Sequence, residues 1–312
     1  MHNAFTPASA KAKMIGIVLK ALRVYQWSKN LLVFAALIFA QQLQYPNQVL
    51  KSLIAFAAFC AASSTMYLFN DLIDVESDRM HPEKRTRPLA SGALSYGAAA
   101  AMVILLLVAS LGLGAALGAR FLCAVLFYLA LTALYTVALK KVVIVDVLAI
   151  AIGFVVRAMA GAVALNVAFS NWLVVCTLFL SLFLAISKRR HEMLSLTDDA
   201  ANHREVLGHY TVPYLDALIL LVAGSTLITY TIYTCSPEVV GRLGTDKLYL
   251  TMPFVVYGLF RYLYLVRTDA EGGDPGSTLL KDGPIRITVL LWGVTCVFII
   301  YWKAIIKSVG LL

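Results

Sequence analysis

The chain has 312 residues, of which 61% are hydrophobic and 14% are charged, and its mean hydropathy is +0.82. Such a composition excludes an ordinary water-soluble enzyme and indicates a protein that crosses a membrane several times. The formal net charge of +9 would suit a nucleic-acid binder, but in a membrane protein it reports loops rich in lysine and arginine. We therefore expect an all-α, polytopic membrane protein without a nucleic-acid partner.

Residues 1–25 are expected to form a basic amphipathic segment on the inner membrane surface. Basic side chains are scattered along it, at Lys11, Lys13, Lys20 and Arg23. The segment lacks the continuous apolar core and cleavage site that mark a signal peptide. We therefore expect a surface segment that precedes the membrane domain.

Residues 26–306 are predicted to form a single catalytic domain of nine transmembrane helices, since a spanning helix needs about 20 apolar residues. The predicted spans are 26–43, 49–72, 93–115, 119–139, 143–165, 171–188, 212–235, 248–267 and 285–306. Basic residues gather in alternate connections, which the positive-inside rule places in the cytoplasm. We expect a multi-pass protein of the bacterial inner membrane, with its N-terminus inside and its polar clusters facing the cytoplasm.

The most informative motif lies where the second predicted span ends, and it combines an amide with several carboxylates. If the helix continues, Asp71, Asp74 and Asp78 stand at i, i+3 and i+7 and share one face, and Asn70 lies one turn before Asp74. Three carboxylates on one face repel each other. Mg²⁺ would relieve that repulsion and usually brings a substrate phosphate with it. The motif therefore predicts a metal–phosphate site.

A basic run follows directly, and Lys84, Arg85 and Arg87 suit a phosphate as well. The alternative interpretation is a solvated acidic helix end followed by a positive cytoplasmic loop. The regular spacing of the carboxylates and the adjacent Asn70 favour the metal–phosphate site over that alternative.

Two further clusters lie at predicted helix ends. The first comprises Tyr135, Lys140, Lys141, Asp146 and Arg157, and the second comprises Lys188, Arg189, Arg190 and Glu192. Arg157 lies inside an apolar span, where a charge is costly and faces the protein interior, so it either forms an ion pair with another helix or contacts a phosphate or carboxylate. The second cluster is either a topological stop signal or a phosphate contact. Gly153 and Gly161 are expected to allow close helix packing.

The motif Asn70-Asp71-x-x-Asp74-x-x-x-Asp78 at the end of helix two, together with nine spans, resembles the UbiA superfamily of intramembrane prenyltransferases. That family holds Mg²⁺ and a prenyl diphosphate with two acidic motifs, on helices two and six. This chain departs at the second motif, where it has Lys188-Arg189-Arg190-His191-Glu192. Three segments are similar to the decaprenyl-phosphate phosphoribosyltransferase branch: Arg23-x-x-Gln26-Trp27-x-Lys29-Asn30, the run from Asp146 to Gly161, and Lys188-Arg189.

The resemblance implies a UbiA-type helical bundle with a central cavity that opens to the cytoplasm. It also implies transfer of a 5-phosphoribosyl group from phosphoribosyl pyrophosphate to a polyprenyl phosphate, with Mg²⁺ as cofactor. Asp71, Asp74 and Asp78 would be the catalytic metal ligands. The implied substrate-binding residues are Asn70, Lys84, Arg85, Arg87, Tyr135, Lys140, Asp146, Arg157, Lys188, Arg189 and Glu192.

Three alternatives remain open at this point. A UbiA-type prenyltransferase acting on an aromatic or other soluble acceptor would need a second acidic motif. A transporter would place charges near the bilayer midplane and often in repeated halves, whereas here they cluster at one face. A CDP-alcohol phosphotransferase would carry an Asp-Gly-x-x-Ala-Arg signature, which the sequence lacks. The sequence does not define the oligomeric state and leaves a homo-oligomer open.

Overall fold

The computed structural model describes residues 7–80, 82, 84–168, 170–195, 205–268, 278 and 281–308, and every regular element among them is helical. The α-helices are α1 (Pro7–Ala21), α2 (Ala35–Phe39), α3 (Pro46–Ile73), α4 (Val75–Met80), α5 (Tyr96–Ala116), α6 (Ala119–Val137), α7 (Val145–Leu165), α8 (Asn171–Ser195), α10 (Val212–Cys235), α11 (Pro237–Leu243), α12 (Met252–Thr268) and α14 (Gly283–Ser308). The 3-10 helices are η1 (Val24–Phe34), η2 (Lys84–Thr86), η3 (Leu139–Lys141), η4 (Glu205–His209) and η5 (Lys247–Thr251).

Within those residues, 8 helices are long and apolar enough to cross a membrane. The apolar stretch Val24–Phe39, formed by η1 and α2, is shorter and corresponds to the first predicted span. The prediction of an all-α, polytopic membrane protein is confirmed, and the predicted count of nine helices is roughly consistent with these 8 helices and the shorter one.

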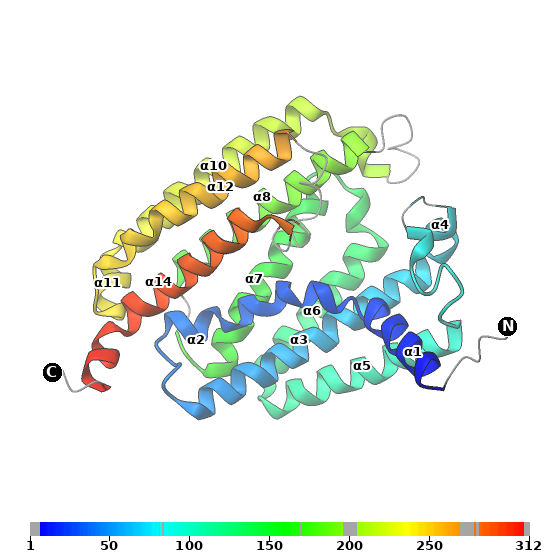
Figure 1. Ribbon diagram of the computed structural model, residues 1–312, viewed down its shortest axis with the longest axis horizontal. Coiled ribbons are helices and arrows are strands. Elements are labelled where there is room, and N and C mark those ends of the chain that lie inside the picture. Colours follow the sequence, from blue (N-terminus) through cyan, green and yellow to red (C-terminus); the bar gives the residue numbers. More distant parts are fainter. Residues whose placement is uncertain are drawn as a thin grey trace.

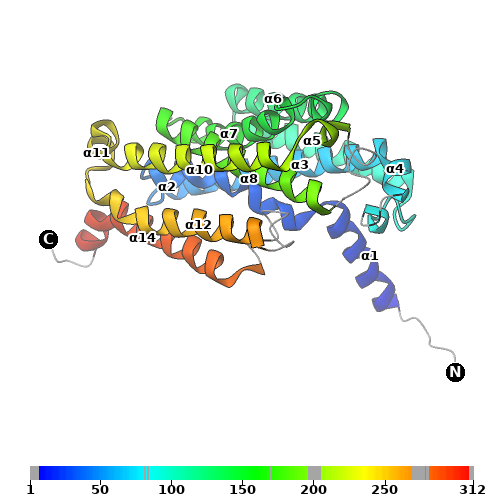
Figure 2. The ribbon, with the colours of Figure 1, turned by 90° about the horizontal axis from the view of Figure 1, so that it is seen from above.

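Helices α3 and α7 form the centre of the bundle. In each of them 67% of the apolar stretch is buried, against 17% in α5, so α5 presents most of its surface to lipid. Figure 2 shows α12 and α14 side by side at one face of the bundle and α6 at the other. In Figure 1, α4 lies at one end of the molecule and α11 at the opposite end. The end of α3 that carries the acidic motif is therefore the end marked by α4.

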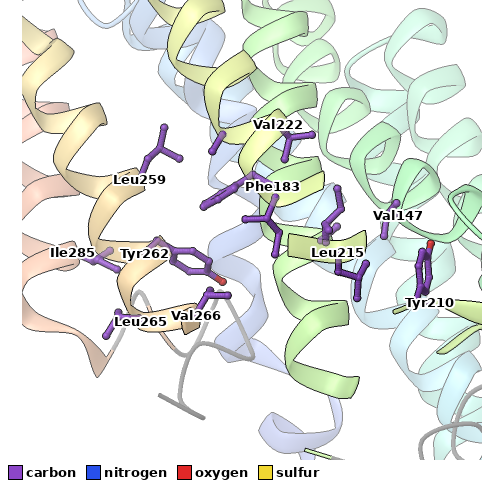
Figure 3. Packing of buried hydrophobic residues seen from close by; sticks show 14 of the residues in the cluster. Val147, Phe183, Tyr210, Leu215, Val222, Leu259, Tyr262, Leu265, Val266 and Ile285 are labelled. Atoms are coloured by element: carbon purple, nitrogen blue, oxygen red, sulfur yellow. The ribbon is translucent and has the colours of Figure 1, made fainter. Parts of the chain in front are cut away.

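The two largest of five apolar clusters pack on opposite sides of α7. One joins α7, α8, α10, α12 and α14, and Figure 3 shows Phe183 of α8 facing Tyr262 of α12, with ring centroids 5.3 Å apart. The other joins α3, α6 and α7, where the Phe59 ring lies 6.0 Å from Phe121. Between membrane-spanning helices such contacts stabilise the bundle through van der Waals packing, because lipid tails are as apolar as these side chains. The two clusters fix α7 between the two halves of the bundle.

The first span departs from an ordinary α-helix, because η1 runs for 11 residues as a 3-10 helix. Runs longer than three or four residues are uncommon in this geometry. At Gly161 of α7, an added Cβ would lie 2.1 Å from the carbonyl oxygen of Val33, so the two backbones are in close approach. At Gly153 an added Cβ would meet nothing closer than 3.7 Å. The expectation of close packing is confirmed at Gly161 and wrong at Gly153.

Candidate functional site

The acidic motif lies where α3 gives way to α4. The expected continuous helix is interrupted at Asp74, whose backbone angles (φ −92°, ψ 9°) end α3 at Ile73. Helical hydrogen bonds still run from the amide of Asp74 to Asn70 (2.9 Å) and from that of Asp78 to Asp74 (2.8 Å). Side chains of Asn and Asp compete for backbone partners and so favour such breaks. The motif therefore keeps its spacing but bends at Asp74.

Asp71 and Asp78 are buried and share a single arginine. Nη1 of Arg87 lies 3.0 Å from Oδ1 of Asp71 and 2.5 Å from Oδ2 of Asp78. Oδ1 of Asp71 also accepts from Nη2 of Arg23 at 2.5 Å. The Arg23 guanidinium lies 4.9 Å from the centre of the Tyr67 ring, which gives it a cation–π contact. Four parts of the chain therefore meet at these carboxylates. They are the turn before η1, the end of α3, helix α4 and the segment after η2.

Asp74 faces a different cation. Nζ of Lys140, on η3, lies 3.3 Å from each carboxylate oxygen of Asp74, and the side-chain amide of Asn70 donates to Oδ2 at 3.0 Å. Both Asp74 and Lys140 are about one quarter exposed, so this pair is open to solvent. The structure thus brings Lys140 to the acidic motif across 66 positions of sequence. Lys84 and Arg85 lie on η2 beside Arg87, and Arg85 is exposed.

A divalent cation fits part of this motif. The described residues contain no group of three or more His, Cys, Asp or Glu side chains arranged to hold a metal ion. The expected cluster of three carboxylates around one metal is therefore not preformed. Asp74 pairs with Lys140, whereas Asp71 and Asp78 pair with Arg87. Asp71 and Asp78 nevertheless approach one cationic atom, Nη1 of Arg87, and carboxylate oxygens are the ligands that Mg²⁺ prefers.

A second network of charges is buried next to α7 and centres on Arg189, which is 1% exposed. Its Nε donates to Asp146 at 2.7 Å, its Nη2 donates to the Tyr135 hydroxyl at 3.2 Å, and its Nη1 pairs with Glu192. Arg189 is thus held by two carboxylates of the protein itself. The structure brings together Tyr135, Asp146, Arg189 and Glu192, and it leaves the neighbouring Lys188 half-buried.

Sequence reasoning missed the residue that completes this network. The hydroxyl of Tyr210, just before α10, donates to the second oxygen of Asp146 (2.7 Å) and accepts from the amide of Ile144 (2.7 Å). Ile144 has φ +69°, a strained conformation for a β-branched residue. A phenol is protonated at neutral pH, and burial raises the pKa of Tyr210 further, so its hydroxyl donates to Asp146. Tyr210 therefore holds the strained turn that carries Asp146 into α7.

Tyr210→Phe tests that role. The substitution leaves the Ile144 amide without its acceptor and removes a donor from Asp146, so we expect the free energy of unfolding to fall by about 1–3 kcal/mol. Tyr214→Phe is the matched control, because Tyr214 stacks on Tyr210 but is 41% exposed. Thermal and denaturant unfolding in detergent measure both variants. Equal losses in the two would contradict the role of the Tyr210 hydroxyl.

Arg157 lies about three turns deeper along α7 than Asp146. It donates to Asn30 Oδ1 (2.7 Å), to the carbonyl of Gly153 (2.9 Å) and to the Tyr128 hydroxyl (2.8 Å). In the part of the chain that the structure describes, all these acceptors are uncharged, so the ion pair expected as one alternative is wrong. Arg157 instead ties η1 and α6 to α7. Its contact with a substrate phosphate stays a prediction.

The geometry defines a multi-pass helical membrane protein with an acidic and basic site at one end of its two central helices. The model of the UbiA prenyltransferase family matches residues 30–280, and the chain belongs to this family. The family predicted from the motifs is thereby confirmed.

Curated relatives and solved structures agree with this assignment. The chain is 35% identical over 292 residues to a decaprenyl-phosphate phosphoribosyltransferase of Corynebacterium glutamicum, covering 91% of this chain and 86% of the relative. It is 33% identical over 294 residues to the enzyme of the same name from Mycolicibacterium smegmatis, covering 91% and 92%. A UbiA homolog from Archaeoglobus fulgidus, solved with DMAPP and Mg²⁺, shares the fold with a TM-score of 0.69 at 18% identity, covering 90% and 98%.

Proposed function

We propose that the protein transfers the 5-phosphoribosyl group of phosphoribosyl pyrophosphate to a polyprenyl phosphate. The observation that carries this proposal is the identity of 35% and 33% to two phosphoribosyltransferases over 91% of the chain. In the reaction, an oxygen of the lipid phosphate bonds to C1 of the ribose while the bond from C1 to the diphosphate breaks. Pyrophosphate leaves with the electron pair. The acceptor is already an anion, so the reaction needs no strong general base.

The acidic motif and its cations would hold the diphosphate of the donor. Asp71 and Asp78, with Asp74 beside them, would hold Mg²⁺, which would supply positive charge against the leaving pyrophosphate. Arg23, Arg87 and Lys140 already lie within 3.3 Å of these carboxylates and can turn to phosphate oxygens. The apolar surface between the helices takes the lipid tail. The chain thus binds and orients the two substrates, which is a large part of such catalysis.

The prenyltransferase alternative is kept because the family and the solved neighbour bound to DMAPP and Mg²⁺ favour it. One experiment separates the two functions. Purified protein with Mg²⁺ is offered labelled phosphoribosyl pyrophosphate and a polyprenyl phosphate, and in parallel a prenyl diphosphate with an aromatic acid. Label appearing in a lipid product only in the first reaction supports the proposal. Product in the second reaction alone would replace it.

Lys188 separates the same functions at the level of a residue. It stands where other family members carry the second acidic motif, so as a phosphate contact it should be needed for phosphoribosyl transfer. Loss of a charge-assisted contact costs about 1.5–3 kcal/mol, so Lys188→Ala should lower kcat/KM roughly tenfold to a hundredfold. Lys188→Asp should be worse, because it sets a carboxylate against a phosphate. A Lys188→Asp variant as active as the wild type would rule out this role.

The site is proposed to face the cytoplasm of a bacterial inner membrane, with the N-terminus inside. Asn47, at the start of α3, and Ser91, which follows α4 and η2 in the chain, are exposed. Figure 1 shows the start of α3 and helix α4 at opposite ends of α3. Single cysteines at these positions, in a background that lacks the native cysteines, report the orientation through an impermeant thiol reagent. We expect labelling at Ser91 only from the cytoplasmic side and at Asn47 only from outside. Labelling of both from one side would contradict the proposed topology.

A further inference from the structure

We infer that Arg87 is a specificity residue that keeps free divalent cations out of the site and admits them only together with a diphosphate. The inference deepens the proposed function and rests on it for the identity of the donor. Asp71 and Asp78 are already paired with arginines, so a metal can bind them only if an arginine gives up its contact.

The position of Arg87 carries the inference. A single nitrogen atom, Nη1, lies 3.0 Å from Asp71 and 2.5 Å from Asp78, and both carboxylates are less than 5% exposed. A divalent cation held by these two carboxylates would need the oxygens that now pair with Nη1, and carboxylate oxygens are the ligands that Mg²⁺ prefers. The guanidinium and the metal therefore compete for the same two carboxylates.

The local charges show why neither ligand binds well alone. Three carboxylates (Asp71, Asp74 and Asp78) meet three cationic side chains (Arg23, Arg87 and Lys140), so the contacts balance. Free Mg²⁺ would displace Arg87 and leave a partly buried guanidinium without its anions. A free diphosphate would draw Arg87 away and leave two buried carboxylates unpaired. Buried charges that lose their partners are strongly unfavourable.

The metal and the diphosphate together remove both penalties. The carboxylates exchange the guanidinium for the metal, and Arg87 exchanges the carboxylates for phosphate oxygens, which suit its planar donor geometry. Binding of the two ligands is then cooperative, and by linkage each raises the affinity for the other by the same factor. The site would select a metal-bound diphosphate and reject the free metal. Arg87 is only 24% exposed, so the exchange takes place largely away from solvent.

Arg87→Gln tests the inference because it predicts opposite changes for two ligands. In this variant Mg²⁺ no longer has to displace a charge-assisted contact from both carboxylates, so the binding of Mg²⁺ alone should tighten at least about tenfold. The same variant should bind Mg²⁺ with pyrophosphate about tenfold to a hundredfold more weakly than wild type, since a charged hydrogen bond is lost. Isothermal titration in detergent measures both affinities on the full chain.

Two further variants control for charge and for folding. Arg120→Gln removes the same net charge from an exposed position at the start of α6, at the end of α3 remote from the motif, and should change neither affinity. Arg87→Lys keeps a cation and should keep the binding of free Mg²⁺ weak. If Arg87→Gln folds poorly, Mg²⁺ alone should raise its thermal stability more than that of wild type. These readouts separate exclusion of the metal from a merely structural role.

The inference is overturned if Arg87→Gln binds Mg²⁺ alone no more tightly than wild type, or if both affinities fall together. It is also overturned if wild type binds Mg²⁺ equally well with and without pyrophosphate. None of these measurements uses phosphoribosyl pyrophosphate. Failure of the proposed donor in the transfer assay would therefore leave the opposite changes in affinity intact, and the two results can be told apart.

Discussion

Asp71→Asn is expected to lower turnover at least about a hundredfold while the protein stays folded. Asp71 is buried and accepts from both Arg23 and Arg87 through one oxygen, so it lies at the centre of the charges that would meet the metal and the diphosphate. Asparagine keeps that oxygen as an acceptor but removes the negative charge. Stabilisation of charge by a bound metal contributes several kcal/mol to such reactions, and each 1.36 kcal/mol is about tenfold in rate.

Glu76→Gln is the matched control for this prediction. Glu76 lies on α4 within the same motif, carries the same charge and is exposed to solvent. It should retain turnover close to wild type. The measurements are the rate of phosphoribosyl transfer, with thermal unfolding as the check on folding. If Asp71→Asn keeps more than about a tenth of wild-type turnover, or if Glu76→Gln loses as much, Asp71 is not a metal ligand in the reaction.

The sequence predicted those features that depend on neighbouring residues. The apolar stretches follow from composition along the chain, and the spacing of Asp71 and Asp78 follows from helical periodicity, which survives the bend at Asp74. Family motifs then added the chemistry of the site, which spacing alone left open between a metal site and a solvated helix end. The confirmed predictions of fold and family rest on these local signals.

The partners of the site residues could not be predicted, because they come from other helices. Lys140 reaches Asp74 across 66 positions of sequence, and Tyr210 reaches Asp146 across 64. A face of a helix can be derived from spacing, but the residue that packs against that face depends on the tertiary arrangement. Arg157 shows the same limit, since its position inside a span predicted a charged partner, whereas its described acceptors are neutral.

Helix α7 connects the elements on which the proposed chemistry depends. At its first turn Asp146 binds Arg189 and Tyr210, and about three turns later Arg157 binds Asn30 of η1. Since Arg23 stands directly before η1, the position of η1 against α7 also sets where the Arg23 guanidinium meets Asp71. The packing of η1 on α7 is therefore part of the architecture of the site.

Gly161→Ala is expected to be the most destabilising single-methyl change in that contact. The added Cβ would lie 2.1 Å from the carbonyl oxygen of Val33 and 2.9 Å from its carbonyl carbon. These are backbone atoms, so no side-chain rotation relieves the clash, and either η1 or α7 must move. Overpacking usually costs about 1–3 kcal/mol, and a backbone clash this short should reach or exceed the upper end of that range. Movement of η1 would also displace Asn30 and Arg23.

Gly153→Ala provides the comparison on the same helix, because its added Cβ would make only ordinary contacts, the nearest with Arg157 at 3.7 Å. Both substitutions gain about 1 kcal/mol of helix propensity, so the difference between them isolates the clash. Thermal unfolding and the monodisperse fraction on size-exclusion chromatography measure the two variants side by side. Gly153→Ala should be at least as stable as wild type, and Gly161→Ala should unfold well below it. Equal stability of the two would contradict the close approach of η1 to α7.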